Sequence, residues 1–323
     1  MRNLLIAGLL MVLTTFSVHA QTLTDYSIAY STGSFTATVG GTTVTSGVGT
    51  LNDGYVNGIP IGFDFFYMGQ RYTTVSVSTN GWLSLGSNIS SAAPLNNLST
   101  GGTRPVIAPL WDDLAVINFA DASYLVSGSG ANRVFTLQVL NNRWNATAAG
   151  PTISYQVKLY EASGKIEFIY RQDANVVSNG SASVGITASG TGSGNFISLF
   201  YNGGAPTASA TTENTTNAVK PPTGFTYTFT PPVPAAPSSL TFTSIGTTGY
   251  TLNWIDNSTI ETGYAIYRST DGSNFTFVNK TAANATSSAQ TGLTPGTLYY
   301  WRVFAVSEGA LSSALQSSAG TVP

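Results

Sequence analysis

Short runs of alternating hydrophobic and polar residues recur along the chain after residue 20, without a sustained helical period of 3.6 residues. Clusters of Gly, Asn, Asp, Pro and Ser separate these runs, which is typical of β-sandwiches and barrels. We therefore expect an all-β fold whose first part is a large antiparallel β-sandwich. The clearest strand-like runs are residues 61–67, 72–77, 82–85, 133–140, 152–160, 165–171, 183–187, 196–201 and 224–230.

One predicted hairpin carries two carboxylates that could be taken for a catalytic pair. Ser163-Gly164 predicts a two-residue turn that places Tyr160 opposite Glu167 and Glu161 opposite Ile166. Because side chains alternate between the faces of a sheet, Glu161 and Glu167 then lie on opposite faces. They do not form the carboxylate pair that glycoside hydrolysis requires.

A proline-rich segment at residues 231–236 divides the chain. Proline fixes φ and removes a hydrogen-bond donor, so this segment is expected to be an extended, stiff linker. It separates an N-terminal β-sandwich domain at residues 21–230 from a second domain at residues 237–323. The stretch 207–217, rich in Thr and Asn, is expected to be a surface loop of the first domain.

Hydrophobic and polar residues alternate clearly along the strand-like runs of the second domain. Its inward-facing residues are expected to be Tyr250, Leu252, Trp254, Tyr264, Ile266, Tyr299, Trp301, Val303 and Ala305. With the runs Gly263–Ser269 and Gly292–Tyr299, the domain resembles a fibronectin type III module, an immunoglobulin-like β-sandwich. The resemblance implies that the Tyr299 hydroxyl bonds back to nearby backbone. It also implies a spacer, since Arg-Gly-Asp is absent from the sequence.

Three motifs of the first domain carry a second resemblance: Phe63–Gly69, Ser78–Trp82 and Pro105–Asp113. They are similar to the nidogen-like extracellular domain. They are also similar to N-terminal β-domains of exported proteins from Gram-negative bacteria that carry fibronectin type III modules. The resemblance implies an extracellular matrix, adhesion or surface-layer context without an established chemistry.

The first twenty residues have the parts of a secretory signal peptide. Arg2 precedes an apolar stretch from Leu4 to Leu13, and small residues Val18 and Ala20 precede a cleavage site before Gln21. The apolar run is shorter than the roughly 18 residues needed to span a bilayer. We expect a secreted or outer cell-surface protein with no transmembrane segment after cleavage.

Composition excludes several classes of function. Only 8% of residues are charged and the net charge is −2, so the basic surface that nucleic acid requires is not expected. The chain contains no Cys, and its single His, His19, lies in the expected signal peptide. A Ser-His-Asp triad, a thiolate nucleophile and a Cys/His metal site are therefore excluded from the mature chain. We expect no catalytic residues and no resident cofactor.

Two candidate ligand sites remain. Asp112 and Asp113 follow the apolar run Ala108–Trp111, and their carboxylates could supply oxygens to calcium. The alternative is that one aspartate caps a turn while the other is solvated. Trp144, in the polar run Asn141–Asn145, and Tyr201, before Asn202-Gly-Gly, are candidate sugar-stacking rings, although most large aromatic residues are core residues.

The sequence thus favours a non-enzymatic exported protein of the surface, matrix or adhesion type. It would carry a β-sandwich head on a fibronectin type III spacer, and its partner would be an extracellular protein or a glycan surface. The alternative is a carbohydrate-binding accessory region of a longer secreted hydrolase. The pattern does not specify an oligomeric state.

Overall fold

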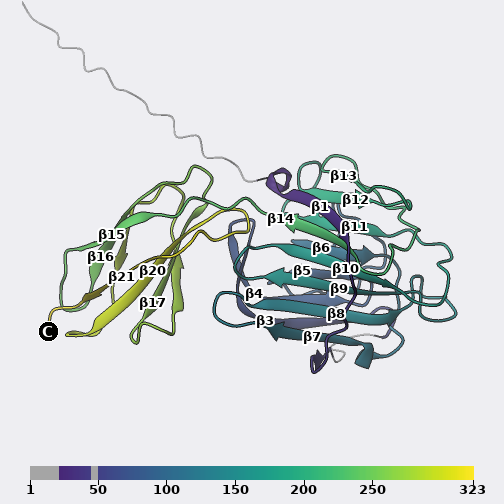
Figure 1. The fold of residues 1–323 in the computed structure, drawn as a ribbon, viewed down its shortest axis with the longest axis horizontal. Coiled ribbons are helices and arrows are strands. Elements are labelled where there is room, and N and C mark those ends of the chain that lie inside the picture. Colours follow the sequence, from purple (N-terminus) through teal and green to yellow (C-terminus); the bar gives the residue numbers. More distant parts are fainter. Residues whose placement is uncertain (1–21, 45–49) are drawn as a thin grey trace, which may run out of the picture.

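The computed structural model describes residues 22–44 and 50–323. The expected signal peptide, residues 1–20, lies outside the described residues. Among the residues described, no helix is both long and apolar enough to cross a membrane. The described chain forms two β-domains, and its helical structure is limited to the short 3-10 turns Leu23–Asp25 (η1) and Phe119–Asp121 (η2) (Figure 1). The all-β fold expected from the sequence is confirmed.

The N-terminal domain, called the head below, is a sandwich of two antiparallel sheets. The order of the first sheet is β1-β14-β10-β9-β8-β7-β2. Its strands are Ser27–Thr32 (β1), Phe225–Thr230 (β14), Ile166–Gln172 (β10), Ile153–Tyr160 (β9), Val134–Asn142 (β8), Ala122–Ser127 (β7) and Thr42–Thr43 (β2). Strands β1 and β14 pair along their whole length, with Ser27 opposite Thr230.

The second sheet of the head has the order β13-β12-β11-β6-β5-β4-β3. Its strands are Thr207–Ser209 (β13), Phe196–Phe200 (β12), Ser183–Thr187 (β11), Val106–Trp111 (β6), Trp82–Leu85 (β5), Gln70–Ser78 (β4) and Tyr55–Tyr67 (β3). The central strand β6 is buried along its whole length. Such a strand must be covered on both faces, which explains why its sequence is almost entirely apolar.

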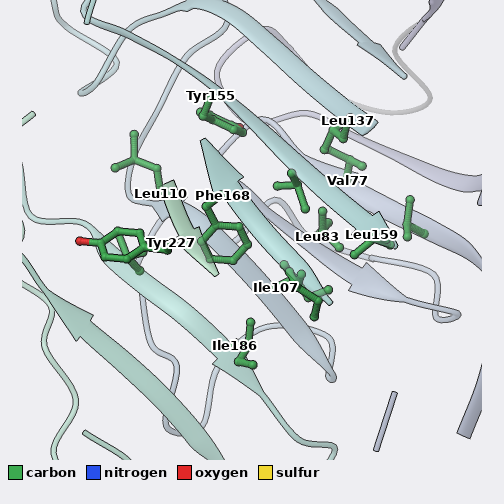
Figure 2. Close-up of a cluster of buried hydrophobic side chains, with 14 of the residues drawn as sticks. Val77, Leu83, Ile107, Leu110, Leu137, Tyr155, Leu159, Phe168, Ile186 and Tyr227 are labelled. Carbon is green, nitrogen blue, oxygen red and sulfur yellow. The ribbon is translucent and has the colours of Figure 1, made fainter. Parts of the chain in front are cut away.

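The main core of the head lies between the inner faces of these two sheets (Figure 2). Strand β14 shows the origin of this core, since Phe225, Tyr227 and Phe229 are buried and the residues between them are half-exposed. Across the sandwich, Leu83 and Ile107 of the second sheet belong to the same buried cluster. Alternating burial of this kind is what the period-two pattern predicts for two packed sheets.

A smaller core covers the outer face of the second sheet. Trp82 and Trp111 lie on that face with ring centroids 5.3 Å apart, and both are buried. Their indole N–H groups donate to the backbone carbonyls of Ala92 and Ala93, which lie in the segment between β5 and β6. This segment therefore shields the second face of β6.

The register of the β9–β10 hairpin differs from the sequence prediction. Ile166 lies opposite Leu159, and Glu167 lies opposite Lys158, so the connecting loop is longer than two residues. The loop closes through hydrogen bonds from Tyr160 N to the Lys165 carbonyl and from Gly164 N to the Tyr160 carbonyl. The predicted two-residue turn at Ser163-Gly164 is wrong because Tyr160 already bonds to Lys165, which leaves residues 161–164 in the loop.

The C-terminal domain, called the module below, is a smaller sandwich. Its first sheet has the order β15-β16-β19 and its second the order β18-β17-β20-β21. The strands are Ser238–Thr243 (β15), Tyr250–Ile255 (β16), Ser287–Gln290 (β19), Thr276–Lys280 (β18), Gly263–Ser269 (β17), Leu298–Val306 (β20) and Leu315–Gly320 (β21). All nine residues expected to face inward belong to one buried cluster.

The Tyr299 hydroxyl bonds to nearby backbone, as the resemblance to fibronectin type III modules implied. Its hydroxyl accepts a hydrogen bond from the Thr294 backbone N–H at 2.9 Å. Hydrogen bonding from the side chain and the backbone of Thr294 to this oxygen lowers the pKa of Tyr299 below its ordinary value. The hydrogen bond joins the loop before β20 to the beginning of that strand.

Tyr299→Phe is expected to destabilise the module by about 1 kcal/mol, the net value of a typical intramolecular hydrogen bond. Urea unfolding of the full chain, followed by fluorescence, measures this loss. The matched control is Tyr300→Phe, because Tyr300 is half-exposed and its hydroxyl makes no hydrogen bond within the described chain. Equal losses in the two variants would contradict the assigned role of the Tyr299 hydroxyl.

Candidate functional site

The structure separates the two aspartates expected to share a calcium ion. Asp112 is 7% exposed, whereas Asp113 is exposed. The Asp112 carboxylate accepts four hydrogen bonds, from Trp144 Nε1, from the N–H and the hydroxyl of Ser181, and from the Asp113 N–H. A carboxylate has about four acceptor positions, so those of Asp112 are filled by protein donors.

Asp113 lies in a different electrostatic setting. Partial burial raises its pKa, and the nearby carboxylates of Asp53 and Asp112 raise it further. Among the residues described, no group of three or more His, Cys, Asp or Glu side chains is placed to hold a metal ion. Calcium binding at Asp112 and Asp113 therefore stays a prediction, and Asp112 has a role in the architecture of the head.

Trp144 is not a sugar-stacking platform. Its exposed fraction is 0%, and its indole N–H donates to Asp112 at 2.9 Å inside the head. The polar residues beside it suggested exposure, but Asn141 and Asn145 have positive φ angles that turn the chain on either side of the ring. The expectation of an exposed Trp144 is wrong. A buried acceptor for its indole N–H is supplied by Asp112, at the end of a strand that is distant in sequence, so the ring can lie in the interior.

Tyr201 is also buried, with 7% of its surface exposed, and its ring packs against Phe225 at a centroid distance of 5.2 Å. The stretch 207–217 is expected to be a surface loop, and all of its residues except Asn217 are exposed or half-exposed. That stretch contains β13 and returns to the interior at Asn217, whose side chain accepts from the Tyr201 N–H and donates to the Leu199 carbonyl. Tyr201 is therefore not an exposed ligand-binding ring.

The two glutamates of the β9–β10 hairpin are engaged by cations. Glu161 receives a bidentate pair of hydrogen bonds from Arg133 at 2.6 and 2.7 Å. Glu167 forms an ion pair with Lys165 at 2.7 Å and accepts from the Tyr160 hydroxyl. Each of the two carboxylates therefore has its own cationic partner.

A contact at the tip of the β3–β4 hairpin joins the two domains, and it is not predicted by the sequence pattern. Met68 and Gly69 both have positive φ in this two-residue turn, a geometry that tightly closes a hairpin. A side chain at position 69 would meet Thr262 of the module at 2.9 Å, so glycine permits the close approach. The Gly69 N–H donates to the Glu308 carbonyl of the module.

Phe66 anchors this contact. It is 2% exposed, and it forms a buried cluster with Ala265 and Val306 of the module. Phe277 lies beside it at a centroid distance of 6.5 Å. The cluster uses the outer face of the sheet formed by β17, β18, β20 and β21, and Figure 1 shows β17 and β20 on the side of the module nearer the head.

Polar groups rim the anchor. Asp64 forms an ion pair with Arg71 at 2.6 Å, and its second oxygen accepts from the Tyr267 hydroxyl at 2.9 Å. Burial and the nearby Asp64 carboxylate raise the pKa of Tyr267 far above its ordinary value. The head and the module are therefore joined by a packed contact as well as by the linker. The expectation of a spacer did not include this packed contact.

Beside the anchor, the two domains enclose a cleft of about 1000 Å³. Head residues on one side include Phe63, Arg71 and Arg133, and module residues on the other include Phe275 and Arg302. Its three arginines are a quarter of the 12 Lys and Arg residues of the chain, so the cleft concentrates a scarce residue type. We take this interdomain cleft as the candidate functional site.

Sequence reasoning missed the cleft because its walls come from distant segments. The available signal was the scarcity of charge, since arginine in so neutral a chain is conspicuous. That signal shows which residues are unusual but not which of them meet. Their meeting depends on how the module docks on the β3–β4 hairpin.

Comparisons with solved structures find matches to about a quarter of the chain. A myokine structure is 23% identical over 28% of this chain and 99% of that chain, with a TM-score of 0.25. The crystal structure of FN3tt is 26% identical over 28% of this chain and 95% of that chain, with a TM-score of 0.25. A fibronectin type III domain of human collagen XX is 24% identical over 27% of this chain and 88% of that chain, with a TM-score of 0.24.

No curated protein matches the chain. Two family models do match, and they divide the chain at the linker. A model described as NIDO related matches residues 25–231, and the fibronectin type III model matches residues 235–318. The chain therefore belongs to the NIDO-related family and carries a fibronectin type III domain after the NIDO-related region.

Proposed function

We propose that this chain is a non-enzymatic extracellular binding protein of the adhesion type, and that it binds its partner in the interdomain cleft. Both domain types are typical of extracellular proteins. The observation that carries the proposal is the cleft of about 1000 Å³, whose walls come from the head and from the module. Ligand sites occur preferentially at such domain boundaries.

The chemistry of the cleft supports binding rather than catalysis. Its carboxylates are engaged, Asp64 by Arg71 and Tyr267, and Glu161 by Arg133. A general base must reach the proton that it removes from a substrate, and these oxygens already hold fixed donors. The groups that remain free in the cleft suit recognition of a partner.

A carbohydrate-binding accessory role has less support. That alternative depended on exposed flat rings at Trp144 and Tyr201, and both rings are buried in the head. The interdomain cleft is the better supported binding site.

The test is binding of the purified chain to a panel of extracellular matrix proteins and polysaccharides, measured by biolayer interferometry. We expect saturable binding to at least one panel member. The same samples are assayed for breakdown of each panel member, and none is expected. The matched variant is Glu161→Gln, which removes a cleft carboxylate.

Two results would overturn the proposal. One is the absence of saturable binding across the whole panel. The other is breakdown of a panel member by the unmutated chain that disappears in Glu161→Gln, which would assign catalysis to the cleft.

A further inference from the structure

One guanidinium in the cleft has no carboxylate partner. Within residues 22–44 and 50–323, Arg71 and Arg133 each form an ion pair, but Arg302 does not. Arg302 Nε donates to the Gln316 side chain at 2.8 Å, which fixes the guanidinium while both terminal NH₂ groups stay without hydrogen bonds in the described chain. Three arginines against two carboxylates leave one positive charge in the cleft.

Three of the five aromatic rings that line the cleft have a guanidinium group over one face. Arg302 lies over Phe275 at 3.8 Å from the ring centroid, and Arg71 lies over Phe277 at 4.5 Å. Arg133 lies over Phe63 at 5.5 Å. A sugar needs a free ring face for stacking, and in these three rings a cation occupies one face. This arrangement favours a polypeptide over a glycan as the occupant.

The composition of the lining matches that of protein–protein interfaces. Aromatic residues and arginine are enriched in the buried centres of such interfaces, where they supply most of the binding energy. The cleft combines the arginines with Tyr267, Phe304 and Leu311, none of which is fully buried. Its volume of about 1000 Å³ lies at the upper end of the range of ligand pockets, which is about 300–1,000 Å³.

We propose that the cleft binds a polypeptide segment of a partner protein that carries a carboxylate side chain, and that Arg302 is the partner of that carboxylate. The inference rests on the proposed binding function and specifies its ligand. A carboxylate is planar and accepts two parallel hydrogen bonds from a guanidinium. The fixed Nε of Arg302 presents its terminal NH₂ groups for this contact.

The test uses two arrays of random eight-residue peptides that differ at one fixed position, Asp in the first and Asn in the second. The full chain, labelled with a fluorophore, is expected to select peptides from the Asp array. For the strongest binder, anisotropy titration is expected to give about tenfold weaker binding after Asp→Asn, because the substitution removes a hydrogen bond between charged groups.

Variants of Arg302 connect this selectivity to the cleft. Arg302→Gln is expected to weaken binding about tenfold, and the change from Asp to Asn in the peptide should then have no further effect, because the two groups form one interaction. Arg302→Lys keeps the charge and should retain part of the affinity. The matched control is Arg268→Gln, which also removes a guanidinium that lies over an aromatic ring but is outside the cleft.

Three outcomes would overturn the inference: equal selection from both arrays, equal loss in Arg268→Gln, or an Asp→Asn effect that persists in Arg302→Gln. Oligogalacturonate serves as a second probe. If it binds in an Arg302-dependent manner while no acidic peptide does, the cleft takes an acidic glycan instead. If Arg302→Gln retains full binding to the matrix panel, the adhesion function stands and only its assignment to Arg302 fails.

Discussion

Replacing Asp112 with alanine is expected to lower the free energy of unfolding of the head by about 4 kcal/mol. Its carboxylate accepts from the Trp144 indole, from two groups of Ser181 and from the Asp113 N–H. A buried donor left without an acceptor costs about 1–3 kcal/mol, and only the Ser181 hydroxyl can rotate to find another partner. Urea unfolding of the full chain, followed by tryptophan fluorescence, measures the loss.

The matched control is Asp113→Asn. Asp113 is exposed, and neighbouring carboxylates raise its pKa, so neutralising it removes no favourable partner. Its effect is expected to stay within about 0.5 kcal/mol, as for most surface substitutions. Comparable losses in the two variants would show that the four hydrogen bonds of Asp112 do not stabilise the head.

Phe66→Ala is expected to weaken the docking of the module by about 3 kcal/mol. Phe66 is buried against Ala265 and Val306, and truncation of a buried phenylalanine costs about 3–5 kcal/mol in a core and 2 kcal/mol or more at an interface hot spot. We expect the thermal transitions of the two domains to overlap in the unmutated chain and to separate in the variant. Scanning calorimetry measures this change.

Tyr30→Ala is the control for aromatic truncation. Tyr30 is 51% exposed on β1, which belongs to the other sheet of the head from β3 and β4, and its ring stacks on Phe225 at 6.0 Å. We expect a loss of about 1 kcal/mol or less and no change in the separation of the transitions. Unchanged calorimetry in Phe66→Ala would mean that the anchor contributes nothing to docking.

The strands and the core of the module followed from local patterning. Alternation at Tyr250, Leu252 and Trp254 places these residues in the interior without knowledge of their partners. The hydrogen bond of the Tyr299 hydroxyl was implied by the resemblance to fibronectin type III modules, and it is made to Thr294, five residues earlier. Features determined within one or two neighbouring strands can be predicted from the sequence.

The error at Trp144 has the opposite cause. The ring lies between polar neighbours, and only the buried acceptor at Asp112, 32 residues away, makes the interior favourable for its indole N–H. A polar setting in the sequence therefore did not mean an exposed setting in the fold. The same holds for Tyr201, which is buried against Phe225 although polar residues follow it in the sequence.

The cleft was beyond sequence reasoning for a further reason. Arg71 and Arg133 lie in the head and Arg302 lies in the module, so their meeting depends on the docking contacts around Phe66. Alternation predicts which face of a strand a residue occupies. It does not predict which outer faces of two domains will meet.

The pairing of β1 with β14 has a consequence for how the head transmits tension. Ser27 lies opposite Thr230, so the polypeptide enters and leaves the head on adjacent strands, which lie about 4.8 Å apart. Pulling these two points apart opens the hydrogen bonds of this pair one after another and does not stretch the sandwich. A head of this kind can be inserted into a string of modules as a side branch, adding little to the contour length of the string while projecting its surface outward.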